Sequence, residues 1–227
     1  MFILERYHNY IFIGGSGSGK TELSVNTAIQ LAASEANKQI CFFDMDQTKG
    51  MFRSRDLRLH LLSEGVLFLD TVDYMDAPVV PAGISSSLSD TKSTCVFDVG
   101  GNVVGAKMIG QYAAGLAEHS TCAFYVLNPF RPFSGTWDDI YDSMKSILNA
   151  SKIPMERVRI LSNPCLGERT SPFLILQAHN WLSELLKKNG LQVAALATES
   201  SALQLIQSKV SCPVLSIRLF VKQLYQG

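Results

Sequence analysis

The chain has 227 residues, of which 47% are hydrophobic, and its 20 basic side chains balance 20 acidic ones. This length and composition suit a globular α/β domain with a full core and exclude a disordered chain. The sequence has no cluster of positive charge, which proteins need to bind nucleic acid independently of its sequence. We therefore expect a single folded domain over residues 1–227.

Cysteine usage and hydropathy indicate the compartment. Four of the five cysteines sit in or beside apolar, strand-like runs, and no C-x-x-C pair occurs: Cys41, Cys95, Cys122, Cys165 and Cys212. This pattern predicts buried thiols in a reducing environment. No apolar stretch approaches membrane-spanning length, and residues 1–9 lack the charged start and long apolar core of a signal peptide. The expected location is the cytoplasm.

Residues 10–21, YIFIGGSGSGKT, join a short apolar run to a glycine-serine loop and then to a segment of helical composition. Gly14, Gly19, Lys20 and Thr21 match the phosphate-binding pattern G-x-x-x-x-G-K-[ST] in the strand–loop–helix order that this pattern requires. Glycines let successive N–H groups turn toward a polyphosphate, and the start of a helix adds free N–H groups and the positive end of its dipole. The stretch predicts a site for a nucleoside triphosphate.

Each residue of this loop has an expected role in holding the nucleotide. Lys20 is expected to reach the β- and γ-phosphates, and the Thr21 hydroxyl is a hard oxygen ligand for Mg²⁺. The predicted nucleotide contacts in and next to the loop are Gly15, Ser16, Gly17, Ser18, Gly19, Lys20, Thr21 and Glu22.

Strand-like and helical stretches alternate along the chain, which predicts an α/β fold with a doubly wound, mostly parallel sheet and helices on both faces. Strands are expected at 10–13, 39–44, 65–69, 93–98, 121–127, 158–161, 192–196 and 214–219. Helices are expected after the phosphate loop, as a short helix after the connection at 70–83, and at 103–117, 137–148 and 173–186.

Aspartates end two of the predicted strands on the side where ligands bind in open α/β sheets. Asp98 ends an apolar strand, so its carboxylate is expected to face the phosphate loop and hold Mg²⁺. Gly100 and Gly101 follow as a segment able to sense the γ-phosphate. Asp44 and Asp46 end the second strand, and either could orient the attacking water or a Mg²⁺-bound water. We favour Asp46 because it lies farther into the loop.

The stretches FFDMDQTKG, VFDVGGN, YVLNPFRP and ILSNP follow the phosphate loop in order, and together they resemble the MinD/ParA class of P-loop ATPases, which includes the nitrogenase iron protein. The resemblance implies that Asp46 is the hydrolytic aspartate of switch I and Asp98 the Mg²⁺-associated one. It also implies that Gly100 lies in switch II and that Asn163 reads adenine. One departure is clear: the second lysine that this class carries early in the loop is replaced here by Gly15.

Residues 163–166, NPCL, lack the lysine and the aspartate of the N/T-K-x-D motif with which related GTPases pair with guanine, so ATP with Mg²⁺ is the expected ligand. The predicted function is a slow ATPase that acts as a nucleotide-dependent switch on a protein partner, with a nucleotide-dependent homodimer as one form of the output.

Two alternatives stay open. A small-molecule kinase could use the same loop, but it needs an arginine-bearing lid, and residues 53–58 form the one arginine-rich loop. A membrane- or DNA-positioning ATPase is the other alternative. An amphipathic C-terminal helix with Leu215, Leu219, Phe220 and Leu224 could lie on a membrane, although a terminal strand or helix packed on the sheet is preferred.

Overall fold

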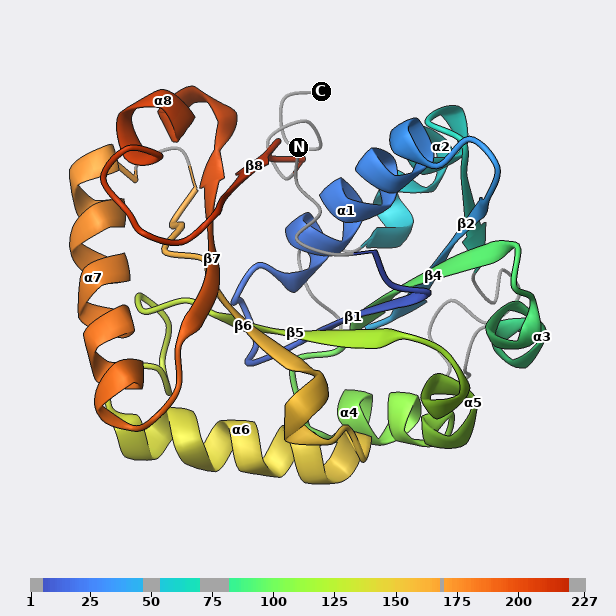
Figure 1. Cartoon of the computed structure of the whole chain (residues 1–227), viewed down its shortest axis with the longest axis horizontal. Helices are drawn as coiled ribbons and strands as arrows, with labels where there is room; N and C mark the ends of the chain where they lie inside the picture. Colours follow the sequence, from blue (N-terminus) through green and yellow to red (C-terminus); the bar gives the residue numbers. More distant parts are fainter. Residues whose placement is uncertain (1–5, 47–53, 70–81, 168–169, 221–227) are drawn as a thin grey trace.

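The structure is a computed structural model that describes residues 6–46, 54–69, 82–167 and 170–220. The polar segment 47–53, most of the predicted connection at 70–83, and Leu224 lie outside the described residues. Eight parallel strands form one sheet in the order β3-β2-β4-β1-β5-β6-β7-β8 (Figure 1). The chain therefore winds outward in both directions from β1, as in a doubly wound sheet.

The strands are β1 (Asn9–Ile13), β2 (Gln39–Met45), β3 (Val66–Leu69), β4 (Ser93–Val99), β5 (Thr121–Leu127), β6 (Val158–Ser162), β7 (Val193–Glu199) and β8 (Val214–Ile217). The α-helices are α1 (Lys20–Ser34), α2 (Arg58–Ser63), α3 (Ile84–Ser89), α4 (Val103–Gly110), α5 (Ala113–Glu118), α6 (Trp137–Ser151), α7 (Pro172–Lys188) and α8 (Leu203–Ile206).

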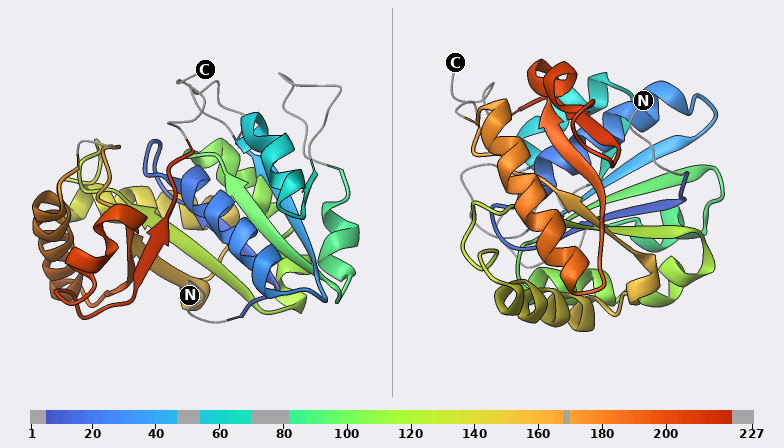
Figure 2. Two further views of the ribbon diagram at one scale, coloured as in Figure 1. Left: turned by 90° about the horizontal axis from the view of Figure 1, so that it is seen from above. Right: turned by 60° about the vertical axis from the view of Figure 1, so that its left-hand side comes forward.

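The alternating side chains of each strand supply two separate cores. In β1, Ile11 and Ile13 pack into the core beneath α3 to α6, whereas Tyr10 and Phe12 pack into the core beneath α1 and α2. Figures 1 and 2 show these two layers of helices on opposite faces of the sheet. A third, smaller cluster joins α7 and α8 to β7 and β8 at one end of the sheet. The predicted fold class is confirmed.

Several predicted boundaries are wrong in ways that packing explains. The helix expected at 103–117 is two helices, α4 and α5. A Cβ atom at Gly110 would lie 2.6 Å from the Ala150 carbonyl oxygen, so α4 ends where its backbone meets the end of α6. Strand β2 ends at Met45, one residue beyond the predicted end, and Asp46 follows it directly. Sequence patterns also missed the short helices α2 and α8.

The C-terminal end of the described chain is held against the helix that follows the phosphate loop. Asn26 of α1 accepts the Arg218 N–H (2.8 Å) and donates to the Arg218 carbonyl oxygen (2.9 Å). Both carboxylate oxygens of Glu22 lie 3.0 Å from the Phe220 N–H, and Gln30 donates to the Ser216 carbonyl oxygen (3.4 Å). Residues 22, 26 and 30 are spaced by four, so they lie on one face of α1.

This arrangement corrects the idea of a membrane-binding C-terminal helix for the residues it covers. Leu215 lies in β8, Phe220 is buried in the core beneath α1, and Leu219 packs against that core. The preferred expectation of a terminal strand packed on the sheet is confirmed. None of the helices in the described ranges combines the length and hydropathy that a bilayer-spanning segment needs.

All five cysteines are free; the thiols of Cys41, Cys95 and Cys122 are buried, and those of Cys165 and Cys212 are half-buried. The expectation of buried thiols therefore holds in full for the three that lie in strands.

We predict that Asn26→Ala lowers the free energy of unfolding by about 2 kcal/mol, because the N–H and C=O groups of Arg218 both lose their protein partner. Urea-induced unfolding measures the change. Asn180→Ala, at an exposed position of α7, is the matched control and should change stability by less than about 0.5 kcal/mol. Equal effects of the two substitutions would contradict the role given to Asn26.

Candidate functional site

The glycine-rich loop leaves the carboxyl end of β1 and enters α1 at Lys20. Three of its glycines, Gly14, Gly17 and Gly19, have conformations that an L side chain rarely adopts. Gly14 has φ 138°, and a Cβ atom there would lie 2.5 Å from the Val126 carbonyl oxygen. Gly19 has φ 95°, and a Cβ atom there would overlap the side-chain amide of Asn163. The loop is therefore held tightly between the ends of β5 and β6.

The start of α1 leaves its first backbone N–H groups available. Gly19 occupies the N-cap position, and no side chain caps the helix. The first helical bond of this turn runs from the Leu23 N–H to the Gly19 carbonyl oxygen. Free N–H groups and the helix dipole together favour an anion at this point. This is the geometry that the phosphate-binding pattern predicts.

Lys20 is buried at the base of the loop, and its Nζ donates a hydrogen bond to the Gly15 carbonyl oxygen (2.9 Å). Burial lowers the pKa of Lys20, and the carboxylates of Asp98 and Asp46 act in the opposite direction. A Cβ atom at Gly101 would lie 2.9 Å from Lys20 Nζ and 2.7 Å from the Ser16 backbone nitrogen. The segment after β4 therefore lies directly against the phosphate loop.

The aspartates at the ends of β2 and β4 lie side by side at one edge of the sheet. Asp44 and Asp98 are register partners across the two parallel strands. Asp44 Oδ1 accepts the Asp46 N–H (3.1 Å), which turns the chain after β2 toward the site. A Cβ atom at Gly100 would lie 3.1 Å from Asp46 Oδ1, so the segments that follow β2 and β4 touch.

Asp98 is fully buried, and within the described ranges neither of its carboxylate oxygens has a hydrogen-bond partner of good geometry. Burial raises the pKa of Asp98 to about 8, and the nearby Asp44 carboxylate adds to the rise, while the Thr21 hydroxyl and the Lys20 ammonium oppose it. A buried carboxylate without a partner is costly unless a cation or a hydrogen-bond donor satisfies it.

The oxygen atoms beside the phosphate loop suit a Mg²⁺ ion that is also bound by phosphates. The described residues contain no cluster of three His, Cys, Asp or Glu side chains that could hold a metal by itself. Magnesium in nucleotide sites needs only one or two protein oxygens, because phosphates and water complete its shell. Thr21 and Asp98 offer such oxygens beside the loop, and Asp46 lies close by.

Asn163 lies at the end of β6 and is almost fully buried. Its Nδ2 donates to the Ser18 carbonyl oxygen (2.8 Å), so its amide group holds the phosphate loop in position. Its Oδ1 is buried and lacks a partner among the described residues. The structure thus gives Asn163 a contact that the sequence did not predict, and its expected contact with adenine stays a prediction.

Glu22 follows Thr21 directly, and its carboxylate accepts the Phe220 N–H. The expected contact of Glu22 with the nucleotide stays a prediction. Its backbone N–H belongs to the first turn of α1, where it can still meet a phosphate.

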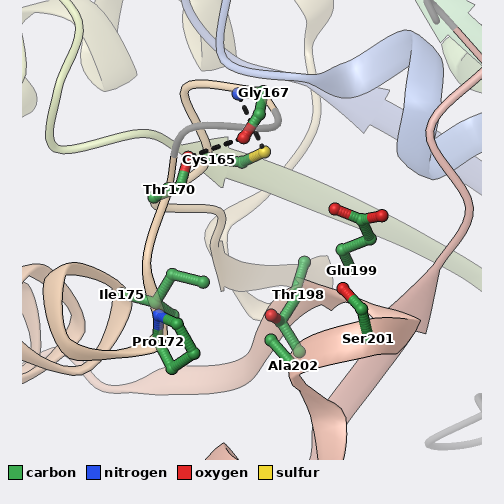
Figure 3. A pocket seen from close by; sticks show the side chains of 10 residues that line it. Cys165, Gly167, Thr170, Pro172, Ile175, Thr198, Glu199, Ser201 and Ala202 are labelled. Carbon is green, nitrogen blue, oxygen red and sulfur yellow. Dashed lines mark hydrogen bonds between the residues drawn. The ribbon is translucent and has the colours of Figure 1, made fainter.

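A small cavity of about 120 Å³ lies where β6 and β7 end, on the same side of the sheet as the loop. Cys165, Thr170, Ile175, Thr198 and Glu199 are among its lining residues (Figure 3). Thr198 Oγ1 is buried and lacks a hydrogen-bond partner in the described part of the chain. The cavity holds the volume of about four water molecules, which suits a single ring system better than a whole nucleotide.

A larger cavity of about 630 Å³ opens on the other side of the loop, between it and α6. Its lining includes Gly15, Ser16, Gly101, Arg131, Asp142 and Ser143. Arg131 is the residue that sequence reasoning missed: its Nε donates to the Gly17 carbonyl oxygen (3.0 Å). An arginine two residues after the Asn128-Pro129 pair at a strand end is the signal that could have found it.

Three features identify the fold: the parallel sheet, the glycine-rich loop after β1, and the aspartates at the ends of β2 and β4. It is a P-loop NTPase fold. No family model matches this sequence, and no curated protein matches it significantly.

Among solved structures, the chain is similar to the signal recognition particle receptor FtsY from Elizabethkingia anophelis in complex with GDP, at 12% identity and a TM-score of 0.39, covering 100% of this chain and 66% of that one. FtsY from Mycoplasma mycoides matches at 13% identity and a TM-score of 0.40, covering 94% and 61%. The chain thus spans less than two thirds of the length of these solved chains. Similarity this low establishes no shared function, and the resemblance to the MinD/ParA class stays a prediction.

We predict that Asn163→Ala weakens binding of ATP, GTP and inorganic triphosphate by a similar factor of about ten, because the loop loses the bond to Ser18. Competition against a fluorescent nucleotide measures all three ligands. Asn189→Ala, whose amide is exposed at the end of α7, is the control and should change none. A loss confined to adenine nucleotides would instead support the base-reading role.

Proposed function

We propose that this protein is a P-loop ATPase that binds Mg·ATP, hydrolyses it slowly, and acts as a nucleotide-dependent switch on a protein partner. The contact between Gly101 and the phosphate loop carries this proposal. A Cβ atom at Gly101 would lie 2.9 Å from Lys20 Nζ, so a γ-phosphate bound by Lys20 would lie next to the segment that contains Gly101. The segment after β4 therefore has a reason to change with the number of phosphates bound.

The roles of the side chains follow from their positions. The loop N–H groups and Lys20 bind the phosphates, and Thr21 and Asp98 hold Mg²⁺, which neutralises phosphate charge when bound. Asp46 accepts a hydrogen bond from the attacking water and orients it toward the γ-phosphate. Its half-buried position next to Gly100 supports this role, because movement of the segment after β4 also moves the surroundings of Asp46.

In this proposal the base occupies the cavity at the ends of β6 and β7, whose lining side chains Figure 3 shows. The missing N/T-K-x-D motif supports ATP over GTP. One observation favours guanine instead: Glu199 lines this cavity, and a carboxylate there could accept the two N–H groups of a guanine edge. Affinity for ATP and GTP measured side by side decides between the two, and a preference for GTP would overturn the ATP assignment.

A small-molecule kinase is the second candidate function. The cavity of about 630 Å³ beside Gly15 and Ser16 favours it, because an acceptor bound there would lie next to the terminal phosphate. The switch is preferred because the contact of Gly101 with the loop accounts for a response to the γ-phosphate without an acceptor. A cytoplasmic location and a protein partner or homodimer belong to the same proposal.

Lys20→Ala should weaken Mg·ATP binding at least about 100-fold, since the charge-assisted bonds of the ammonium to the phosphates are lost. Isothermal titration calorimetry measures the affinity, and the thermal midpoint checks that the variant is folded. Lys187→Ala, an exposed residue of the last turn of α7, is the control with unchanged affinity. Tight Mg·ATP binding by Lys20→Ala would sink the site assignment.

Asp46→Asn should bind Mg·ATP within about threefold of the wild type and hydrolyse it at least about 100-fold more slowly, because the amide cannot orient water in the same way. Phosphate release under single-turnover conditions measures the step. Turnover at the wild-type rate would move the role to Asp44 or to another group.

The switch itself predicts that Mg²⁺ with a non-hydrolysable ATP analogue slows amide hydrogen exchange in residues 98–106 relative to Mg·ADP. Peptides from α7 serve as the internal control, because α7 lies at the far end of the sheet from β4. Light scattering on the same samples reports whether the analogue also drives dimerisation. Identical exchange with the two nucleotides would contradict the switch and leave the kinase as the better account.

A further inference from the structure

The loop between β5 and α6 is held rigidly next to the phosphate loop. Asn128, buried at its start, accepts the Phe130 N–H through Oδ1 (3.0 Å) and donates from Nδ2 to the Cys165 carbonyl oxygen (2.8 Å). Its backbone carbonyl accepts the Arg131 N–H (3.0 Å). These bonds fix the position from which the Arg131 side chain leaves the chain.

The side chain of Arg131 reaches the phosphate loop from this position. Its Nε donates to the Gly17 carbonyl oxygen (3.0 Å), and a Cβ atom at Gly17 would lie 3.4 Å from that Nε. A guanidinium has five N–H donors, so one bond to the loop leaves the others for a ligand. Among the described residues, no carboxylate forms an ion pair with this guanidinium.

The same loop carries backbone strain on the side that faces the site. Phe133 has φ 63°, a left-handed conformation that is unfavourable for a bulky residue, and its side chain is 75% exposed. Phe133 and Arg131 line the same cavity as Gly15 and Ser16. Strained, exposed residues concentrate at binding and catalytic sites, which supports a role for this loop at the phosphates.

We propose that Arg131 is an arginine supplied by the chain itself that contacts the phosphates of the bound triphosphate and stabilises the charge that develops during hydrolysis. The bond from Nε to Gly17 holds the guanidinium at the phosphate loop, and its remaining N–H groups are the donors that bind phosphate oxygens in this proposal. An arginine placed in this way can contribute a factor of about 10³–10⁵ to phosphoryl transfer when it is fully engaged. This inference rests on the proposed function, because it needs a nucleotide in the loop.

The test compares Arg131→Ala, Arg131→Gln and Arg131→Lys with the wild type. Arg131→Ala is expected to bind Mg·ADP within about threefold of the wild type, to lower kcat about 100-fold or more, and to lose the complex with Mg·ADP and aluminium fluoride. Arg131→Gln can still donate to the Gly17 carbonyl oxygen but has no charge, so it is expected to hydrolyse ATP as poorly as Arg131→Ala. Arg131→Lys is expected to recover about tenfold at most, because an ammonium lacks the planar fork.

Arg159→Ala is the matched control, since Arg159 is exposed near the opposite end of β6 and, within the described residues, bonds only to nearby backbone oxygens. Two outcomes would overturn the inference. If Arg131→Ala hydrolyses ATP within threefold of Arg159→Ala, the arginine has no catalytic contact. If Arg131→Gln hydrolyses ATP as fast as the wild type, the residue at position 131 acts only by stabilising the loop through its bond to Gly17.

The failure of this inference and the failure of the proposed function look different. In one outcome the wild type binds and hydrolyses Mg·ATP, while Lys20→Ala loses both activities and Arg131→Ala keeps them. That result would overturn the role of Arg131 alone. A wild type that binds neither Mg·ATP nor Mg·GTP would overturn both.

Discussion

The close fit of the phosphate loop between the ends of two neighbouring strands is the constraint on which the rest of the site depends. Gly14 lies against the backbone of β5, and Gly19 lies against the amide of Asn163 at the end of β6. Any side chain at either position would push the loop off the sheet. Because the loop is held at both ends, its N–H groups can converge on one point before a ligand arrives, which removes much of the entropic cost of ordering them on binding.

The site concentrates charge that the protein alone does not satisfy. Lys20 and Asp98 are both buried; burial lowers the pKa of Lys20 and raises that of Asp98 to about 8. Lys20 opposes the rise in the pKa of Asp98 only in part, because burial and the neighbouring Asp44 carboxylate both raise it. Such an arrangement costs stability in the free protein and is balanced when phosphates and a cation bind. Ligand binding and folding stability are therefore coupled at this end of the sheet.

Hydrogen bonds hold some parts of the site in place and leave other parts able to move. The first turns of α1 are tied to the end of β8 and the residues after it through Glu22 and Asn26, so the helix that carries Lys20 and Thr21 has a fixed position. In contrast, Gly101 lies in close contact with the Ser16 backbone and Lys20 Nζ, and no hydrogen bond joins it to the loop among the described residues. A change at the γ-phosphate would therefore move the segment after β4 more easily than the loop or α1, which is the mechanical requirement for a switch.

The sequence by itself determined the fold class, most of the strands, and the phosphate-binding loop, because these depend on local patterns: apolar runs, glycine spacing, and carboxylates at strand ends. It also predicted that Lys20, Thr21, Asp46 and Asp98 share one site, since parallel strands place their carboxyl ends at one edge; the roles of these residues stay predictions. Only the tertiary structure decided the rest. Arg131 meets Gly17 across 114 residues of chain, Asn163 meets Ser18 across 145, and Glu22 meets Phe220 across 198. No local pattern encodes such contacts, because they arise from how strands and loops distant in sequence pack around one glycine-rich turn.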